Sequence, residues 1–314
     1  MRHSHLKCPA FLPSLIHLFI LILIRAKNQR MKSIKNQKKP PLISVVIPTF
    51  NRAHMLKDAL DSVFAQDFKD FELIVVDDGS TDDTESVLEK YKGRLAVIRQ
   101  QNSGVSTARN RGIAFSSGQR VAFLDSDDMW LPGKLSAQAA FFKNRPDALI
   151  CQTDEIWIRN GKRVNPKNRH KKESGDVFKR SLDLCLVSPS AVMMDRRLFD
   201  DFGVFDETLP ACEDYDLWLR IGSRHPVGLI HEPLVIKRGG HDDQLSKIPV
   251  LDKYRIASII KLLESGLLSD GQRDSAILVL KKKCVIFSNG CRKRGRISEA
   301  DHYADLSRHY TPSR

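Results

Sequence analysis

Val121-Ala122-Phe123-Leu124-Asp125-Ser126-Asp127-Asp128 is the stretch that decides the fold of this 314-residue chain. Its first four residues form a short apolar run, which predicts a buried β-strand, and three carboxylates follow closely. Carboxylates crowded at the end of a buried strand repel one another and lose hydration, so they need a cation or donors nearby. A hard divalent ion is the natural partner, and such ions commonly bring substrate phosphates. A solvated loop or a helix cap is the alternative for this segment taken alone.

Before this stretch, segments with a strand pattern alternate with segments with a helix pattern. Strands are predicted over residues 42–47, 71–76 and 95–98, and helices over residues 55–68, 83–91 and 105–115. This alternation predicts an α/β fold with a mostly parallel sheet, right-handed crossovers and flanking helices. Ligands of such sheets bind beyond the carboxyl ends of the strands, and Pro48, Asp78 and Asp125 all fall there.

The remaining chain divides into regions by composition. Residues 159–175 are polar and basic and are predicted to be a flexible loop, whereas residues 190–194 are predicted to be a strand and residues 213–221 an amphipathic helix. The apolar spacing beyond residue 249 predicts an all-helical tail. We therefore expect a basic lead-in at residues 1–40, a main domain at residues 41–249 and a helical extension at residues 250–314.

The formal net charge of +13 is concentrated at the two ends of the chain. Residues 1–40 hold nine basic and no acidic residues, and residues 253–314 hold thirteen basic and six acidic ones, which leaves −3 for the middle. Basic ends of this kind favour solvation or attraction to an anionic membrane surface. No aromatic-rich basic repeat or zinc-finger spacing indicates a nucleic-acid partner.

The cysteines and the N-terminal residues indicate where in the cell the chain is expected to be. Six scattered cysteines without a C-x-x-C pair favour a reducing compartment and a cytoplasmic location. Residues 11–24 form an apolar run that is short for a membrane span. Three interpretations remain, namely a true start at Met31, which is favoured, a membrane anchor, or a signal peptide.

Five motifs occur in order along residues 42–246, and together they carry a family resemblance. They are SVVIPTFNR (44–52), VVDDGSTD (75–82), GVSTARNRG (104–112), DSDD (125–128) and ED (213–214). This set resembles glycosyltransferase family 2, whose members are inverting, nucleotide-sugar-dependent enzymes with the Rossmann-like GT-A fold. The resemblance implies a nucleotide-sugar donor and a hydroxyl acceptor.

The resemblance also implies roles for the donor-binding residues. The turn at Pro48 and Thr49 and the carboxylate of Asp78 would bind the nucleotide base, which is usually uracil. Arg109 would lie near the nucleotide or diphosphate, and Asp125 would face the ribose.

Metal binding and catalysis are assigned in the same way. The resemblance implies that Asp127 holds Mg²⁺ or Mn²⁺ on the diphosphate and that Asp214 is the general base, with Glu213 beside it. His241 matches a loop histidine that often reaches the metal or diphosphate. Like-charge repulsion between Glu213 and Asp214 is expected to raise the proton affinity of the pair, which suits a base that works near neutrality.

The sequence also narrows the kind of transferase. It has neither the Gln-x-x-Arg-Trp motif nor the long membrane spans of processive polysaccharide synthases, so we expect single additions in cell-envelope glycan synthesis. The acceptor is expected to be a glycan or a lipid-linked glycan at the inner face of the membrane, with peripheral attachment through the basic ends. Two alternatives stay open, a nucleotidyltransferase that makes sugar nucleotides and a non-catalytic nucleotide-sugar-binding protein.

Overall fold

The computed structural model describes residues 39–240 and 251–311, and the compact fold begins at Pro41. The expectations for the apolar run at residues 11–24 and for His241 fall outside the described residues. Within these described ranges, no helix combines the length and the hydropathy of a membrane span.

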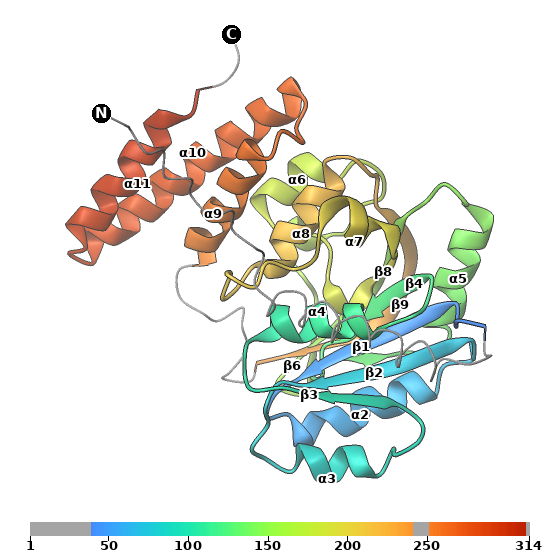
Figure 1. Ribbon diagram of the computed structural model, residues 1–314. Helices are drawn as coiled ribbons and strands as arrows, with labels where there is room; N and C mark the ends of the chain where they lie inside the picture. Colours follow the sequence, from blue (N-terminus) through green and yellow to red (C-terminus); the bar gives the residue numbers. More distant parts are fainter. Residues whose placement is uncertain (1–38, 241–250, 312–314) are drawn as a thin grey trace, which may run out of the picture. The chain divides into compact units, whose positions relative to one another are not determined.

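Alternating strands and helices build the first half of the fold (Figure 1): β1 (Ile43–Thr49), α2 (Ala53–Phe64), β2 (Phe71–Asp77), α3 (Thr84–Glu89), β3 (Ala96–Arg99), α4 (Val105–Phe115) and β4 (Arg120–Phe123). The strands lie in the order β3-β2-β1-β4, and each neighbouring pair is parallel. The carboxyl ends of these strands therefore meet at one edge of the sheet. The predicted α/β fold with helices on both faces of a parallel sheet is confirmed for this half.

The second half extends the sheet with strands of mixed direction: β5 (Met129–Trp130), α5 (Lys134–Asn144), β6 (Ile150–Arg159), β7 (Lys162–Val164), α6 (Phe178–Asp183), β8 (Val192–Asp195), α7 (Arg197–Phe202), α8 (Glu213–Gly222) and β9 (Gly228–Gly239), with 3-10 turns at Asn168–His170 and Pro189–Ala191. β8 is antiparallel to both β4 and β6, and β9 is parallel to β6 and antiparallel to β5. β7 pairs only with β6 and forms a hairpin with it.

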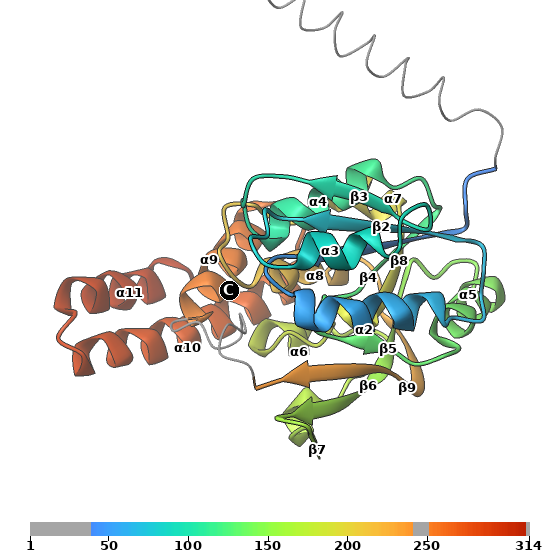
Figure 2. The ribbon, with the colours of Figure 1, turned by 90° about the horizontal axis from the view of Figure 1, so that it is seen from below.

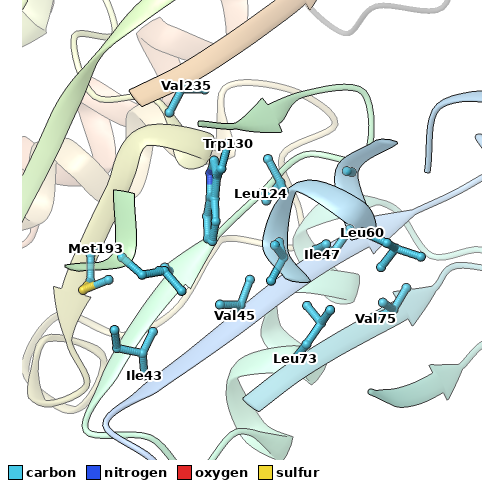
Figure 3. Close-up of a cluster of buried hydrophobic side chains, with 14 of the residues drawn as sticks. Ile43, Val45, Ile47, Leu60, Leu73, Val75, Leu124, Trp130, Met193 and Val235 are labelled. Atoms are coloured by element: carbon cyan, nitrogen blue, oxygen red, sulfur yellow. The ribbon is translucent and has the colours of Figure 1, made fainter. Parts of the chain in front are cut away.

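The main hydrophobic core lies between one face of the sheet and α2 (Figure 3). Ile43, Val45 and Ile47 alternate along β1, so their side chains share that face, and none of them is exposed. Leu56 and Leu60 of α2 are spaced four residues apart and pack against the same cluster. Each fully buried aliphatic side chain of this size contributes roughly 1.5–3 kcal/mol, which fixes the orientation of β1 and the turn that follows it.

The opposite face of β1 is covered by α4. Gly112 lies where a Cβ atom would come within 2.3 Å of Val46 Cγ1, so the helix can approach the strand this closely only with glycine at that position. This contact sets the height of α4 above the sheet, and Arg109 lies one turn earlier on the same helix.

Three helices form the C-terminal extension: α9 (Leu251–Glu264), α10 (Asp270–Lys293) and α11 (Ile297–His309). The predicted helical tail is therefore present. It packs against α6 and α8 of the preceding region (Figures 1 and 2), where Tyr215 and Leu219 of α8 join the apolar cluster of the extension. The other side of α8, with Leu217 and Trp218, packs toward the sheet. Trp218 is buried there.

The sequence-based expectations did not include β5, α5, α6 or α7, and they also missed β6 and β9 and described one region wrongly. β6 and β9 have no clear strand pattern, because polar residues such as Gln152, Thr153 and Glu155 are buried in β6, and β9 contains Pro233 opposite an irregular register. The segment expected to be a flexible loop holds β7 and a 3-10 turn instead, because residues 157–159 pair with residues 162–164.

Candidate active site

One cleft of about 850 Å³ opens at the carboxyl-terminal edge of the parallel strands. Its lining includes eight of the nine residues that the sequence singled out, namely Pro48, Thr49, Asp78, Arg109, Asp125, Asp127, Glu213 and Asp214. The ninth, His241, lies outside the described residues. The positions come from five separate parts of the chain, and the fold brings them to a single cavity.

The three carboxylates after β4 form a compact cluster. One ligand oxygen from each of Asp125, Asp127 and Asp128 lies within 4.8 Å of the others. Burial raises the pKa of Asp128 well above its ordinary value, and the charge of Asp127 adds to that rise. A divalent cation with oxygen ligands would relieve this repulsion, so the donor set fits Mg²⁺ or Mn²⁺.

Ser190 holds the acidic cluster in place. Its hydroxyl donates to Asp128 Oδ2 at 2.7 Å and accepts from the backbone N–H of Asp125 at 3.1 Å. The backbone N–H of Arg238 on β9 donates to the other Asp128 oxygen at 2.9 Å. Asp128 is therefore fixed by two neighbouring elements, while Asp125 and Asp127 are the more exposed members of the cluster.

Arg109 links the acidic cluster to α8. Its guanidinium donates to Asp125 Oδ1 and to Glu213 Oε1, each at 2.6 Å, and only 3% of the residue is exposed. Burial works against its charge, but Asp125 and Glu213 outweigh burial and raise the pKa of Arg109 above its ordinary value. A buried guanidinium between two carboxylates fixes the distance between the carboxyl end of β4 and the first turn of α8.

Glu213 and Asp214 have different surroundings despite being adjacent. Glu213 is buried in its ion pair; burial raises its pKa, Arg109 opposes the rise and Asp214 adds to it. The expected raised proton affinity is thus present at Glu213, with burial as the largest cause. Asp214 Oδ1 accepts the N–H of Tyr215 at 2.7 Å, and Oδ2 accepts the Cys185 thiol at 3.5 Å.

Asp78, one of the residues expected at the nucleotide base, lies directly after β2 and is held by hydrogen bonds. Asp78 accepts hydrogen bonds from Gln100 Nε2 at 2.6 Å and from the backbone N–H groups of Ser103 and Gly104 at 2.9 and 2.8 Å. Asp78 therefore fixes the loop that begins α4. On β1, the buried hydroxyl Oγ1 of Thr49 makes no hydrogen bond within the described chain.

The sequence reasoning did not find Lys237, a buried cation of the cleft. Burial works against the charge of this β9 residue, yet Glu155, Asp128, Asp125 and Asp214 raise its pKa above the ordinary value. Its Nζ donates to Ser188 Oγ at 3.2 Å. Lys237 therefore lies in the combined field of the acidic cluster and Asp214. No motif marks it, because β9 itself was not predicted.

A buried ion pair between Lys172 and Glu155 interacts electrostatically with Lys237 in the cleft. Lys172 Nζ lies 3.0 Å from Glu155 Oε1, with 8% and 4% of the two side chains exposed. The Nε1–H of Trp157 donates to Glu155 Oε2 at 3.0 Å. Burial would raise the pKa of Glu155, but Lys172 and Lys237 lower it to about 2.

Comparison with solved structures identifies the fold. The structure resembles that of TarS from S. aureus (residues 1–349, in complex with UDP-GlcNAc) with a TM-score of 0.63 at 23% identity, over 77% of this chain and 71% of that one. It also resembles the mannosyltransferase PcManGT from Pyrobaculum calidifontis (in complex with GDP-Man and Mn2+), with a TM-score of 0.54 at 16% identity over 92% and 94% of the two chains. The fold is the GT-A fold of glycosyltransferases.

Sequence comparison then gives the family. The family described as "Glycosyl transferase family 2" matches residues 44–203. An uncharacterized glycosyltransferase of Rickettsia typhi is 30% identical over 253 residues, which cover 78% of this chain and 77% of that protein. This chain belongs to glycosyltransferase family 2.

Two relatives with more specific names are also similar. The UDP-Glc:alpha-D-GlcNAc-diphosphoundecaprenol beta-1,3-glucosyltransferase WfgD of Escherichia coli is 31% identical over 185 residues, or 57% of this chain and 69% of that protein. The GalNAc(5)-diNAcBac-PP-undecaprenol beta-1,3-glucosyltransferase of Campylobacter jejuni is 28% identical over 285 residues, or 86% and 85%. The match to this chain covers a smaller share of two other relatives, 64% of a Rickettsia prowazekii protein and 35% of a Rickettsia felis protein.

Proposed function

We propose that this chain moves a sugar from a nucleotide sugar, with UDP as the nucleotide, to a hydroxyl of a lipid-linked glycan, with inversion and one sugar at a time. One observation carries the proposal: the acidic cluster, the cation of Lys237 and the carboxylate of Asp214 converge in a single cleft. The similar proteins support the donor and acceptor, because TarS was solved with UDP-GlcNAc and two relatives are named for undecaprenol-linked diphosphate substrates.

The donor nucleotide would lie against the carboxyl ends of β1 and β2. Pro48 and Thr49 line this side of the cleft, and the Thr49 hydroxyl is available as a donor to the base. Asp78 would act mainly by fixing the Ser103–Gly104 backbone, since three donors already occupy its carboxylate. Asp125 would face the ribose through the oxygen that Arg109 leaves open.

Asp125 and Asp127, with Asp128 behind them, would hold Mg²⁺ or Mn²⁺. When bound, such an ion supplies positive charge to the diphosphate oxygens of the donor. Lys237 would add a second positive charge near the acidic cluster, because its ammonium is held charged by the surrounding carboxylates. The nucleoside diphosphate would then leave into an environment that already carries compensating charge.

Asp214 would accept the proton of the attacking acceptor hydroxyl. Its carboxylate lines the cleft, its hydrogen bonds come from a backbone N–H and a thiol, and it forms no ion pair with another described residue, so it can accept a proton from a substrate hydroxyl. Glu213 is ion-paired to Arg109 and would position that guanidinium instead. One base suffices for inversion, because the acceptor attacks from the face opposite the diphosphate and no covalent sugar intermediate forms.

The wider assignments follow from this reaction. Residues 41–249 would be the catalytic region and residues 250–314 an extension that supports α8 through Tyr215 and Leu219. Nucleotide sugars and lipid-linked acceptors meet at the cytoplasmic face of the membrane, so the chain would act there in envelope polysaccharide assembly.

The proposal is tested by incubating the full chain with a panel of nucleotide sugars in Mn²⁺, Mg²⁺ or EDTA. We expect slow release of nucleoside diphosphate from one or a few donors, which stops with EDTA. Pyrophosphate released from a nucleoside triphosphate would indicate a nucleotidyltransferase. A folded chain that neither releases nucleoside diphosphate nor binds nucleotide in the presence of metal would contradict the proposal.

A further inference from the structure

The segment that links β6 to α6 is strongly basic. Residues 159–172, here called the basic hairpin, contain seven lysines and arginines and no acidic residue. The segment consists of the end of β6, the strand β7 and the 3-10 turn at Asn168–His170. Figure 2 shows β7 at the outer end of β6, on the side of the sheet away from β2 and β3.

Most of these cations are neither buried nor neutralised. Arg159, Lys162, Arg163, Lys167 and Lys171 are exposed, and none of them forms an ion pair with another described residue. Lys172 differs, because it is buried with Glu155. Among the residues that the structure describes, no carboxylate is paired with these five exposed cations, so the basic hairpin presents a positive surface.

The C-terminal extension provides a contrast within the same chain. Several of its cations are paired with carboxylates: Lys282 with Asp183, Arg292 with Asp301, and Arg296 with Glu299. Its basicity was the reason for expecting membrane attachment through the ends of the chain. Ion pairing reduces that attraction, because a neutralised cation gains little from an anionic surface.

The basic hairpin also lies beside the mouth of the active-site cleft. Arg159, His170 and Lys172 line the cleft together with Trp157. The ring centroids of Trp157 and His170 are 5.3 Å apart. Burial lowers the pKa of His170, and the charges of Arg169 and Arg159 lower it further, which reflects the concentration of positive charge here. A partner bound to the hairpin would thus lie next to the acceptor entrance.

We propose that the basic hairpin docks the enzyme on an anionic lipid bilayer, so that the cleft opens toward lipid-linked acceptors. This inference rests on the proposed function, since an acceptor carried by a lipid diphosphate has its sugar near the bilayer surface. Clusters of four to eight cations are typical of attraction to anionic leaflets. A single-stranded nucleic acid fits less well, because the segment has no Phe, Trp or Tyr on which bases could stack.

The experiment measures binding of the full chain to vesicles of phosphatidylcholine with and without phosphatidylglycerol. The test variant carries Lys162→Gln, Arg163→Gln, Lys167→Gln and Lys171→Gln. The matched control removes four ion-paired cations from the extension with Lys282→Gln, Arg292→Gln, Arg296→Gln and Arg308→Gln. We expect the hairpin variant to bind anionic vesicles about a hundredfold more weakly and the control to change by less than about threefold. Wild-type binding should also weaken as salt is raised.

Three results would overturn the docking proposal: equal binding of the hairpin variant and the wild type, an equal or larger loss in the control, or equal binding to vesicles without phosphatidylglycerol. Release of nucleoside diphosphate without acceptor should be unchanged in the hairpin variant, because none of its four positions lines the cleft. A wild-type chain that docks through the hairpin but releases no nucleoside diphosphate from any donor would refute the proposed function and leave the docking surface standing.

Discussion

Replacing Arg109 by methionine should destabilise the fold through a single unpaired charge. Arg109 is 3% exposed and makes two charge-assisted hydrogen bonds of 2.6 Å, one of them to Glu213, whose side chain is 6% exposed. Methionine occupies a similar length but leaves Glu213 without a counter-charge. Removal of one partner from a buried ion pair costs about 3–5 kcal/mol. The loss of the Asp125 partner adds less to this destabilisation, since 27% of the Asp125 side chain is exposed to solvent.

The double variant Arg109→Met with Glu213→Gln separates this charge effect from lost packing. A neutral amide tolerates the apolar neighbour far better than a carboxylate does, so we expect recovery of roughly half the loss or more and a coupling energy of about 2 kcal/mol. Urea unfolding of the full chain, followed by circular dichroism at pH 7, gives the free energy of unfolding for all four proteins of the cycle. An Arg109→Met protein within about 1 kcal/mol of the wild type, or a strictly additive cycle, would refute the reasoning.

Three further outcomes follow from the cleft. Lys237→Met should lower kcat by roughly 10²–10³-fold while nucleotide binding persists, and an unchanged kcat would remove Lys237 from the reaction. Ser190→Ala should weaken Mn²⁺ binding by about tenfold or more, because Asp128 and Asp125 lose a shared partner, and titration calorimetry would show it. The pKa of Glu155 is lowered to about 2, so its charged form stabilises the fold fully above the unfolded pKa near ~4.3, and that contribution is lost as pH falls toward 2. The stability gap between wild type and Glu155→Gln should therefore narrow from pH 5 to pH 2, and a constant gap would contradict the shift.

The placement of the motif residues could be predicted because parallel strands bring their carboxyl ends to one edge. Asp78 and Asp125 come just after β2 and β4, and Pro48 lies near the end of β1; all three line the cleft. The turn expected at Pro48 and Thr49 is still part of β1, because both residues pair with β2. Periodicity alone sufficed for these elements, since β1 and β4 are short, apolar and buried on both faces.

The partners within the cleft could not be predicted in the same way. The ion pair between Arg109 and Glu213 joins residues 104 positions apart, and spacing in the sequence carries no information about it. Lys237 and Glu155 lie on β9 and β6, and both line the cleft. Gln152 and Thr153 of β6 are also buried, away from the cleft lining, so β6 shows no alternating apolar pattern. Lys237 and Glu155 therefore belong to strands that the apolar pattern of the sequence does not mark.

The most direct test of the account compares Asp214→Asn with Glu213→Gln in the same transfer assay. If Asp214 is the base and Glu213 only positions Arg109, Asp214→Asn should lose roughly 10³-fold or more in turnover with nucleotide affinity and the free energy of unfolding nearly unchanged. Glu213→Gln should retain measurable turnover and lose stability instead. Full turnover by Asp214→Asn, measured as nucleoside diphosphate released per enzyme, would contradict the assignment of the base and with it the proposed mechanism.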